Sequence, residues 1–93
     1  DYTQQLKTWI EKDPEYEIIA PVPLNLICFK HKKGNEFNRK LHERVNQSGK
    51  LYITRTKINH EYILRFSIGQ ATTTIEHIKE SWRLIVETAK TLD

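Results

Sequence analysis

The four histidines and the single cysteine are the side chains in this sequence best suited to metal binding or nucleophilic chemistry. Cys28 and His31 lie three residues apart in a stretch whose apolar run predicts a strand. Residues three apart on a strand point to opposite faces, so this pair is not expected to hold a metal. His42, His60 and His77 fall on other expected elements without paired ligand spacing. We therefore expect no metal site, four exposed polar histidines and a buried, unreactive Cys28 thiol.

Phosphate-binding and acyl-transfer motifs are also missing. The three glycines, at positions 34, 49 and 69, are isolated, whereas a phosphate-binding loop needs several close together. Ser48 and Ser67 lack the glycine context of a nucleophile elbow. The sequence predicts that this chain carries no catalytic residue of its own.

Composition and charge narrow the classes of partner. The chain has 93 residues, the size of one small domain, so residues 1–93 are expected to form a single domain. The net charge of +3 is spread along the chain, and the tight basic cluster from Lys30 to Lys33 precedes Gly34. Such a cluster is typical of a solvated loop, whereas nucleic-acid binding needs a broader basic stripe. We expect no nucleic-acid partner.

Membrane and secretory features are not expected either. The longest apolar stretch, from Ile18 to Phe29, is interrupted by Pro21 and Pro23 and is too short to span a bilayer. The segment from Asp1 to Lys12 is polar and lacks the apolar region of a signal peptide. Because Cys28 is the only cysteine, no internal disulfide can form. These features predict a cytoplasmic protein without membrane contact.

Apolar periodicity and turn residues divide the chain into seven expected elements. The helices are expected at Tyr2 to Lys12, at Asn35 to Gln47 and from a cap at Thr73 to about Leu92. The strands are expected at Glu15 to Ala20, Leu24 to His31, Leu51 to Thr56 and Tyr62 to Ile68. The order is α-β-β-α-β-β-α, and short turns between strands make neighbours antiparallel. The expected class is α+β: a small antiparallel sheet of about four strands with helices on one face.

The last helix has the clearest pattern in the chain. Thr73 and Glu76 match a capping box, in which each side chain binds a free backbone N–H. An apolar stripe at helical period follows: Ile75, Ile78, Trp82, Ile85, Val86 and Ala89.

The strand from Tyr62 to Ile68 suggests that another body packs on the sheet. Its first face would carry Tyr62, Leu64, Phe66 and Ile68, and its second face Ile63, Arg65 and Ser67. Three amphipathic helices can cover the first face, but none is left for the second. We expect part of a larger protein to cover the face with Ile63 and Arg65, which should be poorly covered in this chain alone.

Several sequence blocks, in order, point to one family. They are Asp13 to Pro23, Leu24 to Lys30, Asn35, Glu36, Asn38, Val45 to Thr54, Tyr62 to Gly69, His77 and Trp82. Taken together, they resemble the C-terminal part of the group II pyridoxal-phosphate decarboxylases. This family includes the aromatic-amino-acid, tyrosine, histidine and glutamate decarboxylases, and the aromatic-amino-acid type fits better than the glutamate type.

The resemblance implies that the chain is the small C-terminal domain of a fold-type-I enzyme. The parent would be a homodimeric carboxy-lyase that acts on an amino acid and binds pyridoxal phosphate in its large domain. This small domain would pack on the large one, help to close the active site, bind no cofactor and be inactive alone. The His31-Lys32 pair is not expected to be the family's cofactor-binding pair, because the aromatic residue that follows that motif is absent.

The resemblance also singles out Arg65. An arginine at this position pairs with the substrate carboxylate in glutamate decarboxylases and in related aminotransferases, and a planar guanidinium suits two-point carboxylate binding. The alternative is that Arg65 bridges to an acidic residue of the large domain and only holds the interface. Both roles are left open by the sequence.

Two other functions compete with the decarboxylase interpretation. A freestanding α+β nucleic-acid-binding module is possible in principle, but the glycine-aromatic pattern of an RNA-recognition motif is absent. A small regulatory domain that binds an amino acid as an independent dimer would share part of this element order. Tight, salt-dependent oligonucleotide binding would indicate the first, and amino-acid binding by a dimer the second.

Overall fold

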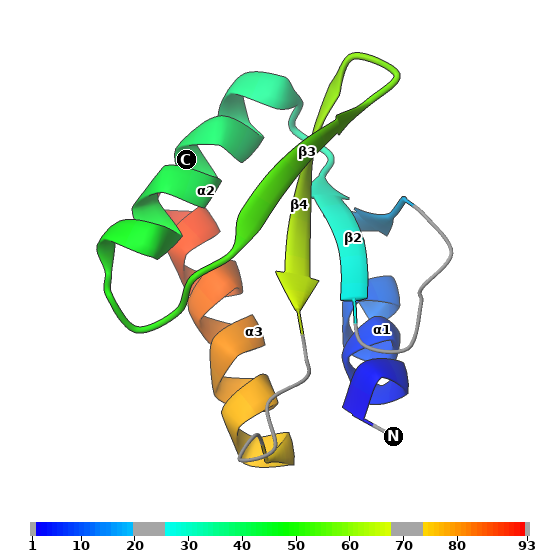
Figure 1. The fold of residues 1–93 in the computed structure, drawn as a ribbon, viewed down its shortest axis with the longest axis vertical. Coiled ribbons are helices and arrows are strands. Elements are labelled where there is room, and N and C mark those ends of the chain that lie inside the picture. Colours follow the sequence, from blue (N-terminus) through cyan, green and yellow to red (C-terminus); the bar gives the residue numbers. More distant parts are fainter. Residues whose placement is uncertain (1, 20–25, 68–73, 93) are drawn as a thin grey trace.

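The computed structural model describes residues 2–19, 26–67 and 74–92, which form three helices and four strands (Figure 1). The helices are α1 (Tyr2–Lys12), α2 (Asn35–Gln47) and α3 (Ile75–Thr91). The strands are β1 (Tyr16–Ile18), β2 (Leu26–His31), β3 (Thr54–Ile58) and β4 (Glu61–Ser67). The expected element order is confirmed. The expected strand extensions to Ala20, Leu24 and Ile68, and the prolines at 21 and 23, lie outside the described residues.

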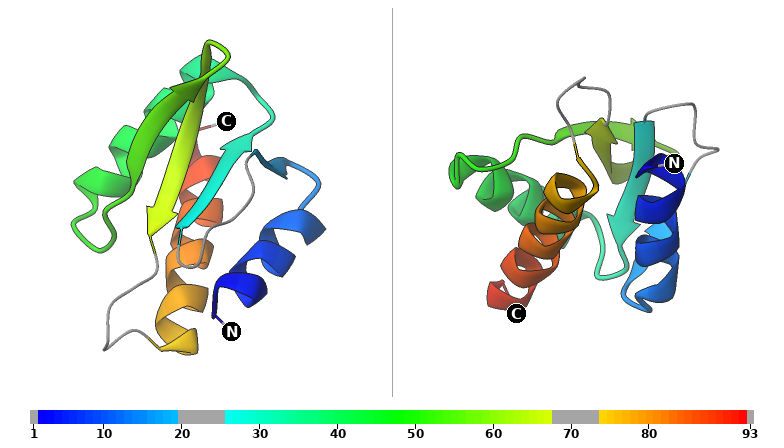
Figure 2. Two further views of the ribbon diagram at one scale, coloured as in Figure 1. Left: turned by 45° about the vertical axis from the view of Figure 1, so that its right-hand side comes forward. Right: turned by 90° about the horizontal axis from the view of Figure 1, so that it is seen from below.

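The four strands form one antiparallel sheet in the order β1-β2-β4-β3. β3 and β4 are a hairpin, whereas β2 pairs with β4 across the intervening α2. All three helices lie on the same side of this sheet, as the view from below shows (Figure 2). The α+β class with helices on one face is therefore confirmed.

The core lies between the sheet and the helices. Strand alternation directs Tyr62, Leu64 and Phe66 of β4 into it, next to Ile27 and Phe29 of β2. The helices contribute apolar residues from one face of each: Leu6, Ile10, Leu41, Val45, Ile78, Trp82, Ile85 and Ala89 are all buried. Each large apolar side chain removed from water in this way contributes about 1.5–3 kcal/mol before chain entropy is counted.

Asparagines attach α2 to the sheet. Buried Asn38 donates from Nδ2 to the carbonyl of His31 at 2.9 Å and accepts the His31 N–H at 2.8 Å. Asn46 makes the same two bonds with the backbone of Ile53, at 2.9 and 2.8 Å. Each carboxamide thus replaces a strand neighbour and satisfies two backbone groups that would otherwise lack partners.

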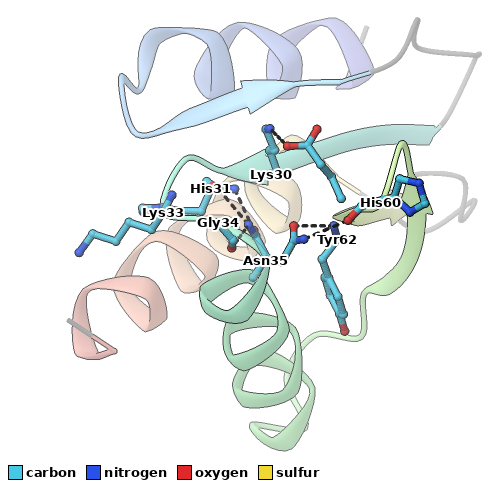
Figure 3. A network of polar contacts seen from close by, with 9 residues as sticks. Lys30, His31, Lys33, Gly34, Asn35, His60 and Tyr62 are labelled. Atoms are coloured by element: carbon cyan, nitrogen blue, oxygen red, sulfur yellow. Dashed lines mark hydrogen bonds and ion pairs between the residues drawn. The ribbon is translucent and has the colours of Figure 1, made fainter.

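A third asparagine fixes the tip of the β3–β4 hairpin. Asn35, at the start of α2, donates to the carbonyl of His60 and accepts the N–H of Tyr62 (Figure 3). The two turn residues, Asn59 and His60, have φ values of 53° and 68°. Positive φ at both central positions is the geometry of tight two-residue hairpins, which asparagine tolerates better than most residues.

The expected bounds of β3 were wrong by three residues at the start and by two at the end. Residues 51–56 have strand-like composition, but the strand runs from Thr54 to Ile58. The backbone of Ile53 is bound by the Asn46 side chain instead of by β4. The chain therefore joins the sheet only after Ile53, and the turn shortens to Asn59 and His60.

The N-terminal cap of α3 is also displaced from the expected position. Thr74, not Thr73, is the cap, and its hydroxyl accepts the N–H of His77 at 3.1 Å. A capping box through Thr73 and Glu76 is therefore incorrect, because the residue three positions after Thr74 is His77. Thr73 itself lies outside the described residues.

Candidate functional site

The side of the sheet opposite the helices is the candidate site. Its outward positions, which we call the open face, are Glu17, Cys28, Lys30, Thr54, Thr56, Ile58, Glu61, Ile63 and Arg65. No helix of the described chain lies on this side (Figure 2). The open face is thus the side of the sheet that the described helices leave uncovered.

Arg65 lies in the middle of the open face. In the strand register it is paired with Cys28 of β2 on one side and with Thr54 of β3 on the other. Its side chain is half-buried, and within residues 2–19, 26–67 and 74–92 it has no hydrogen-bond or ion-pair partner. A guanidinium in this position can bind a carboxylate through two parallel hydrogen bonds.

Ile63 contradicts the expectation of a poorly covered face. Its side chain is fully buried, although no helix covers it. In the register it lies between Lys30 of β2 and Thr56 of β3. Lys30 forms an ion pair with Glu61 at 2.5 Å, two positions from Ile63 on the same strand face. The burial of Ile63 therefore does not come from the three helices.

Among the described residues, the open face carries one ion pair and two charges without an ion-pair partner, those of Arg65 and of the exposed Glu17 at the sheet edge. The charge of Lys30 is balanced by Glu61, and only 18% of the Lys30 side chain is exposed (Figure 3). Arg65 has no such partner within the described chain. A surface that docks here should place a carboxylate opposite Arg65, since burying an unpaired guanidinium is costly.

The expectation of four exposed histidines was wrong for two of them. His31 is 2% exposed, because its position at the end of β2 directs it against Tyr16 and Phe37. Burial lowers the pKa of His31, although nearby Glu15 opposes this shift. Its Nδ1 accepts the N–H of Lys33 at 3.2 Å, and its Nε2 lies 3.4 Å from Glu15. Neutral His31 with a proton on Nε2 satisfies both contacts.

His42 is half-buried and links three segments. Its Nδ1 lies 2.8 Å from the hydroxyl of Tyr62, and its Nε2 lies 3.1 Å from the carbonyl of Ile53. The Nδ2 of Asn46 also lies 3.1 Å from Nε2, so both ring nitrogens of His42 have polar neighbours. His42 is therefore a structural residue of the α2–sheet junction. The remaining histidines, at positions 60 and 77, are exposed as expected.

Cys28 and His31 do not come together. Cys28 is half-buried on the open face, not fully buried as expected, whereas His31 points into the helix side. Within the part of the chain that the structure describes, no three His, Cys, Asp or Glu residues are arranged to hold a metal ion. None of the described helices is long and apolar enough to cross a membrane.

Comparison with known proteins shows which sequences this chain is similar to. No family model matches it. Phenylacetaldehyde synthase of Arabidopsis thaliana is 35% identical over 96 residues, which is 96% of this chain and 20% of the relative. A tryptophan decarboxylase of Camptotheca acuminata is also 35% identical, with 96% and 20% covered. The chain is homologous to one segment of the aromatic-amino-acid decarboxylases. It spans about a fifth of the length of the curated relatives it matches.

The fold of the chain is also similar to that of a segment of a decarboxylase. The crystal structure of Catharanthus roseus tryptophan decarboxylase in complex with L-tryptophan matches 99% of this chain with a TM-score of 0.94 and 28% identity. The match covers 20% of that structure. The predicted resemblance to pyridoxal-phosphate decarboxylases is thus confirmed, and the fold is that of a domain within such an enzyme.

Proposed function

We propose that this chain is the C-terminal domain of a pyridoxal-phosphate-dependent aromatic-amino-acid decarboxylase. The observation that carries the proposal is that almost the whole chain aligns with about one fifth of decarboxylases, in sequence and in fold. A large domain of the same parent chain would contact the open face. The small domain would then help to enclose the amino-acid substrate and exclude water from it.

The cofactor would belong to the large domain. Pyridoxal phosphate, when bound, supplies the electron sink that decarboxylation requires. The described residues of this chain do not fit such a site. Lys30, the lysine of the open face, is held in an ion pair with Glu61, and Lys32, next to His31, is solvent-exposed. This chain would therefore contribute enclosure and positioning.

Arg65 is the residue through which the domain would act. Its side chain is half-buried, central and without a partner in the described chain, so we assign it a carboxylate from outside the chain. Two sources have the same chemistry: the substrate carboxylate, and an acidic side chain of the large domain. The first would make Arg65 a substrate-binding residue, and the second an interface residue.

The parent would be a cytoplasmic homodimer. A chain with one half-buried cysteine and no disulfide suits a reducing compartment. The homodimer follows from the family resemblance, and the molar mass of the full-length protein by light scattering would test it.

Decarboxylation assays with two proteins test the proposed function. The full-length protein with added pyridoxal phosphate should release CO2 from at least one of L-tryptophan, L-tyrosine and L-phenylalanine. The 93-residue chain should release none and should give no saturable visible absorption band with the cofactor. Decarboxylation by the short chain alone, or no activity of the full-length protein on any aromatic amino acid, would contradict the proposal.

A further inference from the structure

Tyr52, in the segment between α2 and β3, is an exposed aromatic residue with 80% of its surface accessible to solvent. Within residues 2–19, 26–67 and 74–92, its hydroxyl and its ring have no hydrogen-bond or ring partner. A single exposed aromatic side chain is common on protein surfaces, so exposure alone assigns no role to it. The role follows from how the backbone holds Tyr52 and from which residue lies beside it.

The backbone on both sides of Tyr52 is held against the core. The side chain of Leu51 packs on the core, and Ile53 is 1% exposed within it. Asn46 binds both the carbonyl and the N–H of Ile53, at 2.9 and 2.8 Å. Because the residues before and after Tyr52 both face the core, Tyr52 points away from it. A side chain presented from a fixed backbone loses less conformational entropy when a partner binds it.

Tyr52 extends the open face. Buried Ile53 and exposed Thr54 alternate as in a strand, so Tyr52 lies on the same side as Thr54. Thr54 is directly opposite Arg65 in the β3–β4 register. Two residues of chain span at most about 7 Å, so the Cα atom of Tyr52 lies within that distance of the Cα atom of Thr54. The exposed ring and the unpaired guanidinium therefore belong to one continuous surface.

Tyr52 and Arg65 together define the chemistry of a complementary surface. Tyrosine and arginine are enriched among the residues that contribute most to protein–protein binding, and such residues insert into desolvated pockets of the partner. The ring of Tyr52 suits an apolar pocket, and the guanidinium of Arg65 suits a carboxylate next to that pocket.

The length of the curated relatives indicates where such a partner comes from. About four-fifths of their length lies outside the segment that this chain matches, which is enough for a large domain on the same polypeptide. A domain that is covalently attached is also present at high effective concentration, so a modest contact area is enough to keep the two domains docked.

We propose that Tyr52 is the apolar anchor of the open face, and that its ring inserts into an apolar pocket of the parent's large domain, beside the carboxylate that Arg65 binds. This inference rests on the proposed function, since it takes the large domain as the partner. Docking removes the exposed ring from water, and the fixed backbone limits the entropic cost of holding it there.

The reactivity of Cys28 measures docking, because this half-buried thiol lies on the open face, paired with Arg65 in the register. Iodoacetamide labelling of Cys28, followed by peptide mass spectrometry, should be slower in the full-length protein than in the 93-residue chain. Its rate in the full-length protein follows the population of the undocked state. In full-length Tyr52→Ala, loss of the anchor should raise this rate roughly 10- to 30-fold, toward the rate in the short chain.

Two matched variants show whether the ring itself is responsible. Tyr52→Phe keeps the ring, so the labelling rate of Cys28 should change by less than about threefold. Lys79→Ala truncates an exposed side chain of α3, on the other side of the sheet, and should label like the unsubstituted protein. In the 93-residue chain, Tyr52→Ala should leave the thermal midpoint unchanged, because Tyr52 has no partner there to lose.

Four results would overturn the anchor. They are equal Cys28 labelling in full-length Tyr52→Ala and the unsubstituted protein, a lowered midpoint of the short chain, a raised KM with unchanged labelling, and labelling of the short chain that slows as its concentration rises. The third would assign the ring to the substrate, and the fourth would assign the face to a second copy of this chain. Failure of the proposed function is separate: the unsubstituted full-length protein would release no CO2, which the labelling does not measure.

Discussion

Arg65 combines three properties that seldom occur together: a central strand position, partial burial and an unneutralised charge. The register places it between Cys28 and Thr54, neither of which carries a carboxylate. Lys30, its nearest basic neighbour on β2, is neutralised by Glu61 within the chain. A conservative substitution at Arg65 can therefore distinguish substrate binding from interface packing.

Replacing Arg65 with lysine in the full-length protein keeps the charge but removes the two-point geometry. If Arg65 holds the substrate carboxylate, the loss should be about 1.5–3 kcal/mol, or roughly 10- to 150-fold, mainly in KM. If Arg65 pairs with the large domain, the thermal midpoint should fall while KM stays near normal. Measuring both quantities on Arg65→Lys decides between the two, and an unchanged KM with a lowered midpoint would exclude the substrate role.

His31 should make the stability of this chain depend on pH. Its pKa in the folded chain is below that of an unfolded histidine, about 6.5. The unfolded chain therefore binds the proton more readily, and the stability contributed by neutral His31 is present above pH 6.5 and is lost as the pH falls toward the folded-state pKa. Urea midpoints at pH 7.5 and 5.5 measure this, and a His31→Gln variant should show a smaller difference. An equal pH dependence in the variant would show that other groups are responsible.

At the scale of elements, α2 is the part on which the sheet depends. Its side chains at 35, 38 and 46 each bind backbone groups of a different segment: the β3–β4 turn, the end of β2 and the approach to β3. The helix thus fixes the ends of strands as well as covering their faces. Because these strands carry Lys30, Thr54 and Arg65, the geometry of the open face depends on a helix on the opposite side.

Asn38→Ala should be among the more destabilising single substitutions. It leaves the N–H and the carbonyl of His31 without partners in a buried place, at a cost of about 2–4 kcal/mol. Asn35→Ala is the matched control, because it also removes a pair of hydrogen bonds to the backbone. Asn35 is exposed, so water can replace these bonds, and the substitution should cost about 1 kcal/mol or less. Urea denaturation of both variants measures the difference. Equal losses would show that burial is not what makes the Asn38 contact important.

The helices were predictable from the sequence because their apolar period and stop signals are local. α1 and α2 have the expected bounds, and α3 ends one residue before the expected Leu92. The start of β3 was not predictable, because residues 51–53 have strand-like composition and only the side chain of Asn46, on another element, removes Ile53 from the sheet. The burial of His31 and Ile63 was missed for the same reason. The burial of His31 depends on Tyr16 of β1 and Phe37 of α2, which lie on other elements and are not revealed by the order of residues along the chain.

At the scale of the whole molecule, the two sides of the sheet differ in how they are covered. One side of the sheet is covered by three helices, and no helix of the described residues lies on the other side (Figure 2). A two-layer domain can be stable in this form if its outer side is polar enough, and the Lys30–Glu61 ion pair and the threonines of β3 make it polar. The chain should therefore remain folded without its partner, with Arg65 as the group that changes most on docking.

Removing the charge of Arg65 should have different effects in the two molecular contexts. In the 93-residue chain, Arg65→Leu should change the free energy of unfolding by less than about 0.5 kcal/mol, because the arginine has no partner in the described chain to lose. In the full-length protein, the same substitution would leave a carboxylate buried and unpaired, at a cost of about 3–5 kcal/mol in stability or substrate binding.

Thr56→Val, a nearly isosteric change on the same face, controls for altered strand packing. Chemical denaturation of both proteins, with KM for the longer one, measures the contrast. A large loss in the short chain would mean that Arg65 stabilises the domain itself, and no loss in either context would remove the open face as the docking surface.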